Sequence, residues 1–146
     1  MSLSNVYTAG LGNVGSYQVS GIPFASGSIE VNSTAKKIEF PYVTQWIQVV
    51  AHTGSASDVK VGFSENGVEG TNYYRIHVAN NDNHETAYAF PITMKVSEIW
   101  LKCDNSDTAS VDVIAGLTNI PVARINNLSG SGDIVGNNWS GSVGVG

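Results

Sequence analysis

Residues 37–64 read KIEFPYVTQWIQVVAHTGSASDVKVGFS, and this stretch decides the fold. Its longest β signal covers residues 44–52, which are rich in β-branched and aromatic residues. Successive side chains of a strand point to opposite faces. Ile47, Val49 and Ala51 then share one face of this strand, and Trp46, Gln48 and Val50 share the other. After a polar turn, residues 59–64 alternate in the same way, which is typical of a strand with one face in water.

A related pattern returns later in the chain. Phe40-Pro41 corresponds to Phe90-Pro91, residues 46–50 to residues 99–103, and residues 59–64 to residues 111–118. Because proline cannot donate a hydrogen bond to a sheet, each Phe-Pro pair indicates a corner where the chain passes from one sheet to the other. The pattern predicts two related β-units packed face to face, and convergent β-patterning is the alternative origin of their similarity.

The rest of the body, residues 28–118, also consists of short strand signals separated by Gly- and Asn-rich turns. Asn66-Gly67 is a strong signal for a hairpin turn. No window has the apolar spacing and caps of a helix. We therefore predict an all-β protein, a single β-sandwich or jelly-roll-like domain of about eight strands, with an arm at each end.

Charged residues make up only 13% of the 146-residue chain, and the net charge is −5. An acidic chain with few basic residues does not fit a nucleic-acid partner, which requires clustered Lys and Arg. No apolar run is long enough to span a membrane, and no signal peptide is visible, so synthesis in a cytoplasm is expected. Cys103 is the single cysteine and ends an apolar strand, which predicts a buried, inert thiol.

Both ends of the chain are Gly- and Ser-rich but keep isolated apolar residues. We name residues 1–27 the N-terminal arm and residues 119–146 the C-terminal arm. A freely solvated linker would not need apolar side chains, so we expect the arms to lie across another surface and fill small pockets. The residues expected to bind a partner in this way are Tyr7, Leu11, Tyr17, Ile125, Leu128, Ile134 and Trp139.

No motif in the sequence predicts a reaction, a metal or a cofactor. Residues 10–15 match G-x-G-x-x-G, but no strand feeds this loop and no helix follows it, so nucleotide binding is not expected. The histidines His52, His77 and His84 do not share a ligand spacing. The acidic residues are scattered, and no G-x-S-x-G motif occurs. We therefore predict a protein that is not an enzyme.

One strand face is a candidate binding surface. Residues 72–79 alternate so that Tyr73, Arg75 and His77 share one side. An exposed face with these residue types is suited to a protein or glycan partner. The alternative is an ordinary half-exposed sheet face.

Several segments resemble small virion proteins of tailed phages of marine and cyanobacterial type. The resemblance rests on GLGNVGSYQVSGIPF at the start, on FPYVTQWIQVV and VGFSENGVEGTNYY, on VSEIWL and VIAGLTNIP, and on NNWSGSVGVG at the end. These proteins look like capsid decoration or other particle-surface proteins. The resemblance implies a β-sandwich on the outside of a virion, with a trimer at threefold positions as the favoured assembly, and it carries over no catalytic residues.

The expected function is that of a decoration or cement protein, whose partners are the major capsid protein and neighbouring copies of itself. Laying an arm on a neighbour costs about 1–2 kcal/mol per ordered residue, which apolar burial offsets. Assembly in the host cytoplasm and residence in the virion follow from the resemblance. The alternatives are a tail or fibre adhesin that binds host glycans and, third, a β-sandwich hydrolase or lectin.

Overall fold

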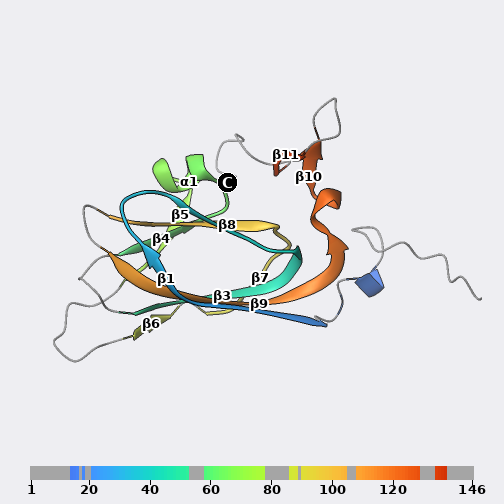
Figure 1. Ribbon diagram of the computed structural model, residues 1–146, viewed down its shortest axis with the longest axis horizontal. Helices are drawn as coiled ribbons and strands as arrows, with labels where there is room; N and C mark the ends of the chain where they lie inside the picture. The colour runs from blue at the N-terminus through green and yellow to red at the C-terminus, as the bar shows by residue number, and fades with distance from the viewer. Residues whose placement is uncertain are drawn as a thin grey trace, which may run out of the picture.

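The computed structural model describes residues 14–16, 18, 21–52, 58–77, 86–88, 90–104, 108–128 and 134–137. These residues form two antiparallel sheets that face each other across one apolar core (Figure 1). This confirms the predicted all-β sandwich of about eight strands. Tyr7, Leu11, Tyr17 and Trp139, four of the residues expected to bind a partner, lie outside the described residues.

Sheet A has four strand positions in the order β1, β9, β3 and a shared edge of β6 and β7. Its strands are β1 (Ile22–Val31), β3 (Tyr42–His52), β6 (Thr86–Tyr88), β7 (Ile92–Thr93) and β9 (Ala109–Pro121). Both β6 and β7 pair with β3, and Phe90 and Pro91 lie between them. Proline interrupts this edge because it has no N–H to donate.

Sheet B has the order β2, β8, β4 and β5. Its strands are β2 (Lys36–Glu39), β4 (Val59–Gly62), β5 (Tyr73–Ile76) and β8 (Glu98–Cys103). A short helix, α1 (Glu65–Glu69), joins β4 to β5 and lies on the outer side of this sheet (Figure 1). The 3-10 turn η1 (Val14–Ser16) precedes the body, and η2 (Val122–Arg124), β10 (Asn126–Leu128) and β11 (Ile134–Asn137) follow it.

The strand order is that of a jelly roll. Four pairs are nested in the sequence: β4 with β5, β3 with β6 and β7, β2 with β8, and β1 with β9. The chain is therefore one long antiparallel hairpin whose tip is the β4–β5 pair. Rolling this hairpin up adds the contacts of β9 with β3 and of β8 with β4, which close the two sheets.

The two related stretches of the sequence occupy corresponding places in the two sheets. Residues 46–50 lie in β3, flanked by β9 and the β6/β7 edge, and residues 99–103 lie in β8, flanked by β4 and β2. The Phe-Pro pairs do not correspond. The chain changes sheets at Pro41, as expected, but Pro91 lies within sheet A, and the change there comes after β7. Phe40 is buried, whereas Phe90 is 83% exposed.

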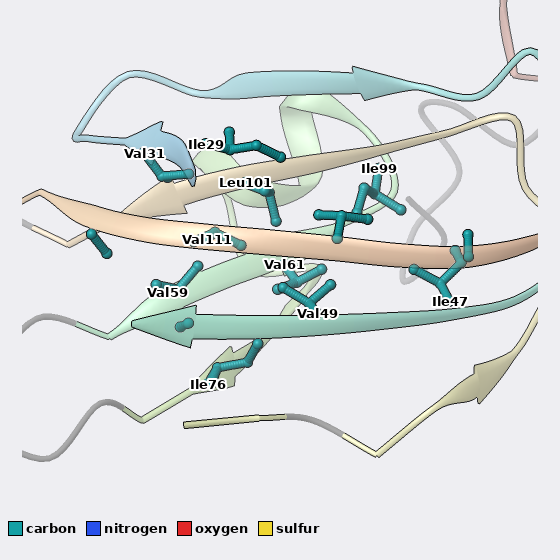
Figure 2. Packing of buried hydrophobic residues seen from close by; sticks show 14 of the residues in the cluster. Ile29, Val31, Ile47, Val49, Val59, Val61, Ile76, Ile99, Leu101 and Val111 are labelled. Atoms are coloured by element: carbon teal, nitrogen blue, oxygen red, sulfur yellow. The ribbon is translucent and has the colours of Figure 1, made fainter. Parts of the chain in front are cut away.

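The core lies between the sheets and follows the predicted alternation. Ile47, Val49 and Ala51 of β3 point inward and are buried. Figure 2 shows Ile47 and Val49 together with inward residues of sheet B, which include Val59, Val61 and Leu101. Cys103 is fully buried, as predicted, and its Sγ lies 3.3 Å from the backbone oxygen of Val31. Among the described residues, no buried side-chain polar atom lacks a hydrogen-bond partner.

Local structure differs from the prediction at residues 64–70. Asn66-Gly67 does not form a hairpin turn but lies inside α1, so the prediction of no helix is wrong here. Ser64 is the N-cap residue, and its Oγ accepts a hydrogen bond of 2.9 Å from the backbone N–H of Gly67. This bond satisfies one of the donors that a helix start leaves free, and it selects the helix over the hairpin.

The body also extends beyond residues 28–118. β1 begins at Ile22, inside the segment assigned to the N-terminal arm, and pairs with β9 from there. β9 continues to Pro121, inside the segment assigned to the C-terminal arm. Ile125 then packs with Val43 and Ile120 in a second small apolar cluster.

Candidate functional site

The two outer faces of the sandwich differ in character. The outer face of sheet B carries four of the chain's seven basic residues, which are Lys37, Lys60, Arg75 and Lys102. Lys102, Lys60 and Arg75 stand side by side on adjacent strands. Like charges in such a row repel each other, so each needs an acidic neighbour.

The predicted Tyr73, Arg75 and His77 face belongs to this charged surface. Lys60 Nζ bonds to one oxygen of Asp104, and Arg75 Nη2 lies 3.4 Å from the other. Lys60 Nζ lies 4.8 Å from the centre of the Tyr73 ring, and Arg75 Nη2 donates to Tyr73 Oη at 3.0 Å. The hydrogen bond from Lys60 lowers the pKa of Asp104 and keeps it ionised. Tyr73 and Arg75 are thus held in an ion-pair and cation–π network within the chain.

His77 stands beside this network. Its side chain is 80% exposed, and Nδ1 lies 2.5 Å from Oδ1 of Asp58. His77 follows the last residue of β5, so its place on the side of Tyr73 and Arg75 stays a prediction. The sequence did not indicate Asp58, Lys60 or Asp104 as partners. Tyr74 points to the opposite face, where burial raises its pKa to about 12.

A second cluster lies on the same face toward β2. Lys37 Nζ lies 2.7 Å from Glu39 and 3.7 Å from Glu98, which are paired across β2 and β8. Trp100 Nε1 donates to Glu98 at 3.1 Å, and Lys37 lies over the Trp100 ring at 5.8 Å. Glu39 and Glu98 share one lysine on an open sheet face, so this cluster is better suited to holding β2 on β8 than to acid–base chemistry.

The outer face of sheet A is apolar at its centre. Ile114 is 41% exposed and lies in register between Ala25 of β1 and Gln48 of β3. Trp46 and Val50 project from β3 on the same side and are half-buried. We define the apolar patch as Pro23, Ala25, Trp46, Val50 and Ile114 on this face, with Phe90 at the β6/β7 edge. None of these six side chains is charged.

Asp112 lies at one end of the apolar patch and contacts Ser28 and His52. We call these three residues the acidic latch. The register between β1 and β9 shifts between Ser26 and Ile29, and Ser28 has a positive φ of 56°. The Ser28 N–H donates to Oδ1 of Asp112 at 2.7 Å, and His52 Nε2 lies 2.7 Å from Oδ2. Asp112 thereby fixes the β1 bulge and joins it to β3. The hydrogen bond from Ser28, and then that from His52, lowers the pKa of Asp112.

This latch predicts a pH dependence of stability. The pKa of Asp112 is lowered on folding from its ordinary value of 3.8, so its contribution is present above that value and disappears as the pH falls through the folded pKa. Asp112→Asn should therefore lower the free energy of unfolding at pH 7, and the difference from wild type should shrink below about pH 4. Urea unfolding between pH 7 and 3 measures it. Because Ser28 is the larger cause, His52→Gln should retain most of this dependence, and a difference that does not change with pH would contradict the latch.

The described part of the C-terminal arm is only partly available to a partner. Ile125 is 6% exposed and packs against its own chain, so its side chain is not available to fill a pocket on a partner. Leu128 and Ile134 pair with each other in the β10–β11 hairpin. Partner binding by Leu128 and Ile134 stays a prediction. The same holds for the four arm residues outside the described ranges, which are Tyr7, Leu11, Tyr17 and Trp139.

Within the described ranges, no group of three or more His, Cys, Asp or Glu side chains is placed to hold a metal ion. The same residues contain no helix long and apolar enough to cross a membrane. A comparison of the chain with protein-family models, curated proteins and solved structures finds no match.

Proposed function

We propose that this chain is a non-enzymatic structural protein of a phage virion, a decoration or cement protein that binds the outer surface of a capsid. The observation that supports it best is the contrast between the two outer faces. Sheet B holds its charges in internal ion pairs, whereas sheet A presents the apolar patch. Central regions of protein interfaces are depleted in charge and enriched in large apolar residues, as this patch is.

The jelly roll suits such a role because its two paired sheets support both outer faces. The partners proposed are the major capsid protein and neighbouring copies of the chain, with a trimer favoured by the resemblance to phage particle proteins. Many weak contacts on a particle act together, so a small patch and two arms are sufficient for firm attachment.

The proposal is tested by removing residues 126–146, which leaves Ile125 in its cluster with Val43 and Ile120. The truncated chain is expected to keep its melting temperature and to bind particles at least about tenfold more weakly, a loss of roughly 1.4 kcal/mol or more. Quantitative mass spectrometry of purified particles gives the number of copies relative to the major shell protein.

Each result has a definite meaning. Unchanged occupancy after truncation would rule out attachment through the C-terminal arm. Absence of the full chain from purified particles would overturn the proposed function. A few copies per particle, in place of hundreds, would indicate a tail location.

A tail or fibre adhesin is the second candidate, and the Tyr73 network favours it. Aromatic and charged side chains on an open sheet face are suited to a glycan. In that case, glycan-array binding survives removal of residues 126–146 and is lost in Tyr73→Ala. A hydrolase is less well supported, because the acidic side chains on the outer face of sheet B contact basic side chains. Those acids are Glu39, Asp58, Glu69, Glu98 and Asp104.

A further inference from the structure

The apolar patch extends across all four strand positions of sheet A. Pro23 and Ala25 lie on β1 at one edge, and Phe90 lies between β6 and β7 at the other. With neighbouring strands about 4.8 Å apart, the patch is about 14 Å wide. Gln48 lies beside Ile114 on β3 and is the polar side chain within this area. An exposed apolar area of this kind on a protein with so few charges marks a surface that another chain covers.

The N-terminal arm has the matching chemistry. The first charged side chain of the protein is Glu30, so residues 1–29 carry none. Within residues 1–13, Val6 and Tyr7 are adjacent, and Thr8, Ala9 and Gly10 separate them from Leu11. Laying this segment on the apolar patch would bury apolar side chains without desolvating a charged side chain, which is the costly step in covering a surface.

The point at which this segment leaves the body favours a second copy over the same copy. Gln45 Nε2 donates to the backbone oxygen of Gln18 at 2.7 Å, and η1 contacts β9. Figure 1 shows η1 beyond the end of the sheets, beside the curved end of β9. Residues 1–13 precede this anchored position, and β1 follows it. To cover the patch of the same molecule, the chain would have to reverse its direction between residues 1–13 and β1. Thirteen extended residues reach about 45 Å, enough to cross the patch of a neighbour.

We propose that the apolar patch is the docking surface for residues 1–13 of a second copy of this chain. Copies then associate by arm exchange, each arm lying across the outer face of a neighbouring sheet A. This contact forms between copies of the chain alone and needs no particle. Only its occurrence on the surface of a particle rests on the proposed function.

A complementation experiment with full-length chains tests it. Ile114→Asp places a charge in the patch, and Leu11→Asp places one in the segment. Each variant is expected to self-associate at least about tenfold more weakly than wild type in sedimentation velocity. Ser33→Asp is the matched control, since it adds the same charge in the exposed β1–β2 turn and should associate as wild type does.

The decisive sample is an equimolar mixture of the two variants. The intact segment of the Ile114→Asp chain can dock on the intact patch of the Leu11→Asp chain, so the mixture should form a dimer that neither variant forms alone. Ala25→Asp, exposed on β1 beside Ile114, replaces Ile114→Asp if that variant has a lower melting temperature.

Four results would overturn the proposal. Wild type could remain monomeric at every concentration, which would leave the segment on its own patch or undocked. Leu11→Asp could associate like wild type, which would indicate patch-to-patch packing of two copies. Patch variants that associate like wild type would place the contact elsewhere. Variants that stay monomeric when mixed would exclude arm exchange. None of these measurements involves particles, so they are independent of the occupancy test of the proposed function.

Discussion

Leu101→Ala is expected to lower the free energy of unfolding by about 3–5 kcal/mol, the largest effect of a single substitution that we predict. Leu101 is fully buried and lies on β8, a central strand of sheet B, where it faces sheet A across the core. The substitution removes apolar contacts and leaves a cavity. Hydrogen bonds of β8 to β2 and β4 on both sides hinder the backbone from collapsing into that cavity. Urea unfolding at pH 7, monitored by far-UV circular dichroism, measures the change.

Ile114→Ala is the matched control for this prediction. It also shortens a large aliphatic side chain on a central strand, but Ile114 points outward and is 41% exposed. Its expected cost is below about 1 kcal/mol, measured at a concentration where the chain is monomeric. Equal losses for the two variants would mean that Leu101 does not lie at the centre of the core. A net stability of about 5–15 kcal/mol is usual for a domain, so the first variant would lose a large share of it.

The fold was predictable from the sequence to the level of strands and faces. The alternation in residues 44–52 correctly grouped Ile47, Val49 and Ala51 on one side of β3, because burial between two sheets constrains every second residue. Which of the two sides faces the core was not predicted. The jelly-roll order was not determined by that pattern. It depends on which strands pair, as in β3 with β9, and such pairing between distant segments leaves no mark on local periodicity.

The same limit applies to the candidate site. The side shared by Tyr73 and Arg75 follows from alternation alone, and β5 has both residues on its outer side. Their partners come from other strands, as Lys60 does from β4, and depend on a register that the sequence does not display. The apolar patch was missed for this reason, since Ile114 and Ala25 meet only when β1 pairs with β9. The sequence signal that could have indicated the apolar patch was the Phe90-Pro91 pair.

At Ile125 and in α1, tertiary contacts produce a structure that differs from the one predicted from the local sequence. Residues 119–146 are Gly-rich and polar, yet Ile125 returns to an apolar cluster of its own chain. Asn66-Gly67 favours a hairpin locally, yet Ser64 caps a helix there. In α1, Val68 is fully buried, so packing of this one side chain adds to the cap in stabilising the helix.

Gly62→Ala is the second large prediction, and it tests the packing of α1 on sheet B. A Cβ at Gly62 would lie 2.6 Å from Val68 Cγ1 and 3.3 Å from the backbone oxygen of Asn72, so α1 would have to move. The expected loss of stability is about 1–3 kcal/mol, as for other overpacked sites. Amide hydrogen exchange should become faster in residues 64–72, because these residues form the displaced segment.

A double-mutant cycle identifies the cause of that loss. Val68→Ala removes the clashing methyl group, so the added cost of Gly62→Ala should be smaller in the Val68→Ala background than in wild type. Gly21→Ala is the matched control, since a Cβ there would meet no atom within 4 Å, and its expected effect is within about 0.5 kcal/mol. If Gly62→Ala lowered the free energy of unfolding equally in wild type and in the Val68→Ala background, the clash with Val68 would not be the cause of the loss. A smaller increase in exchange in residues 64–72 when Gly62→Ala is added to Val68→Ala than when it is added to wild type would confirm that α1 is held on sheet B by the fit of Val68 over a glycine.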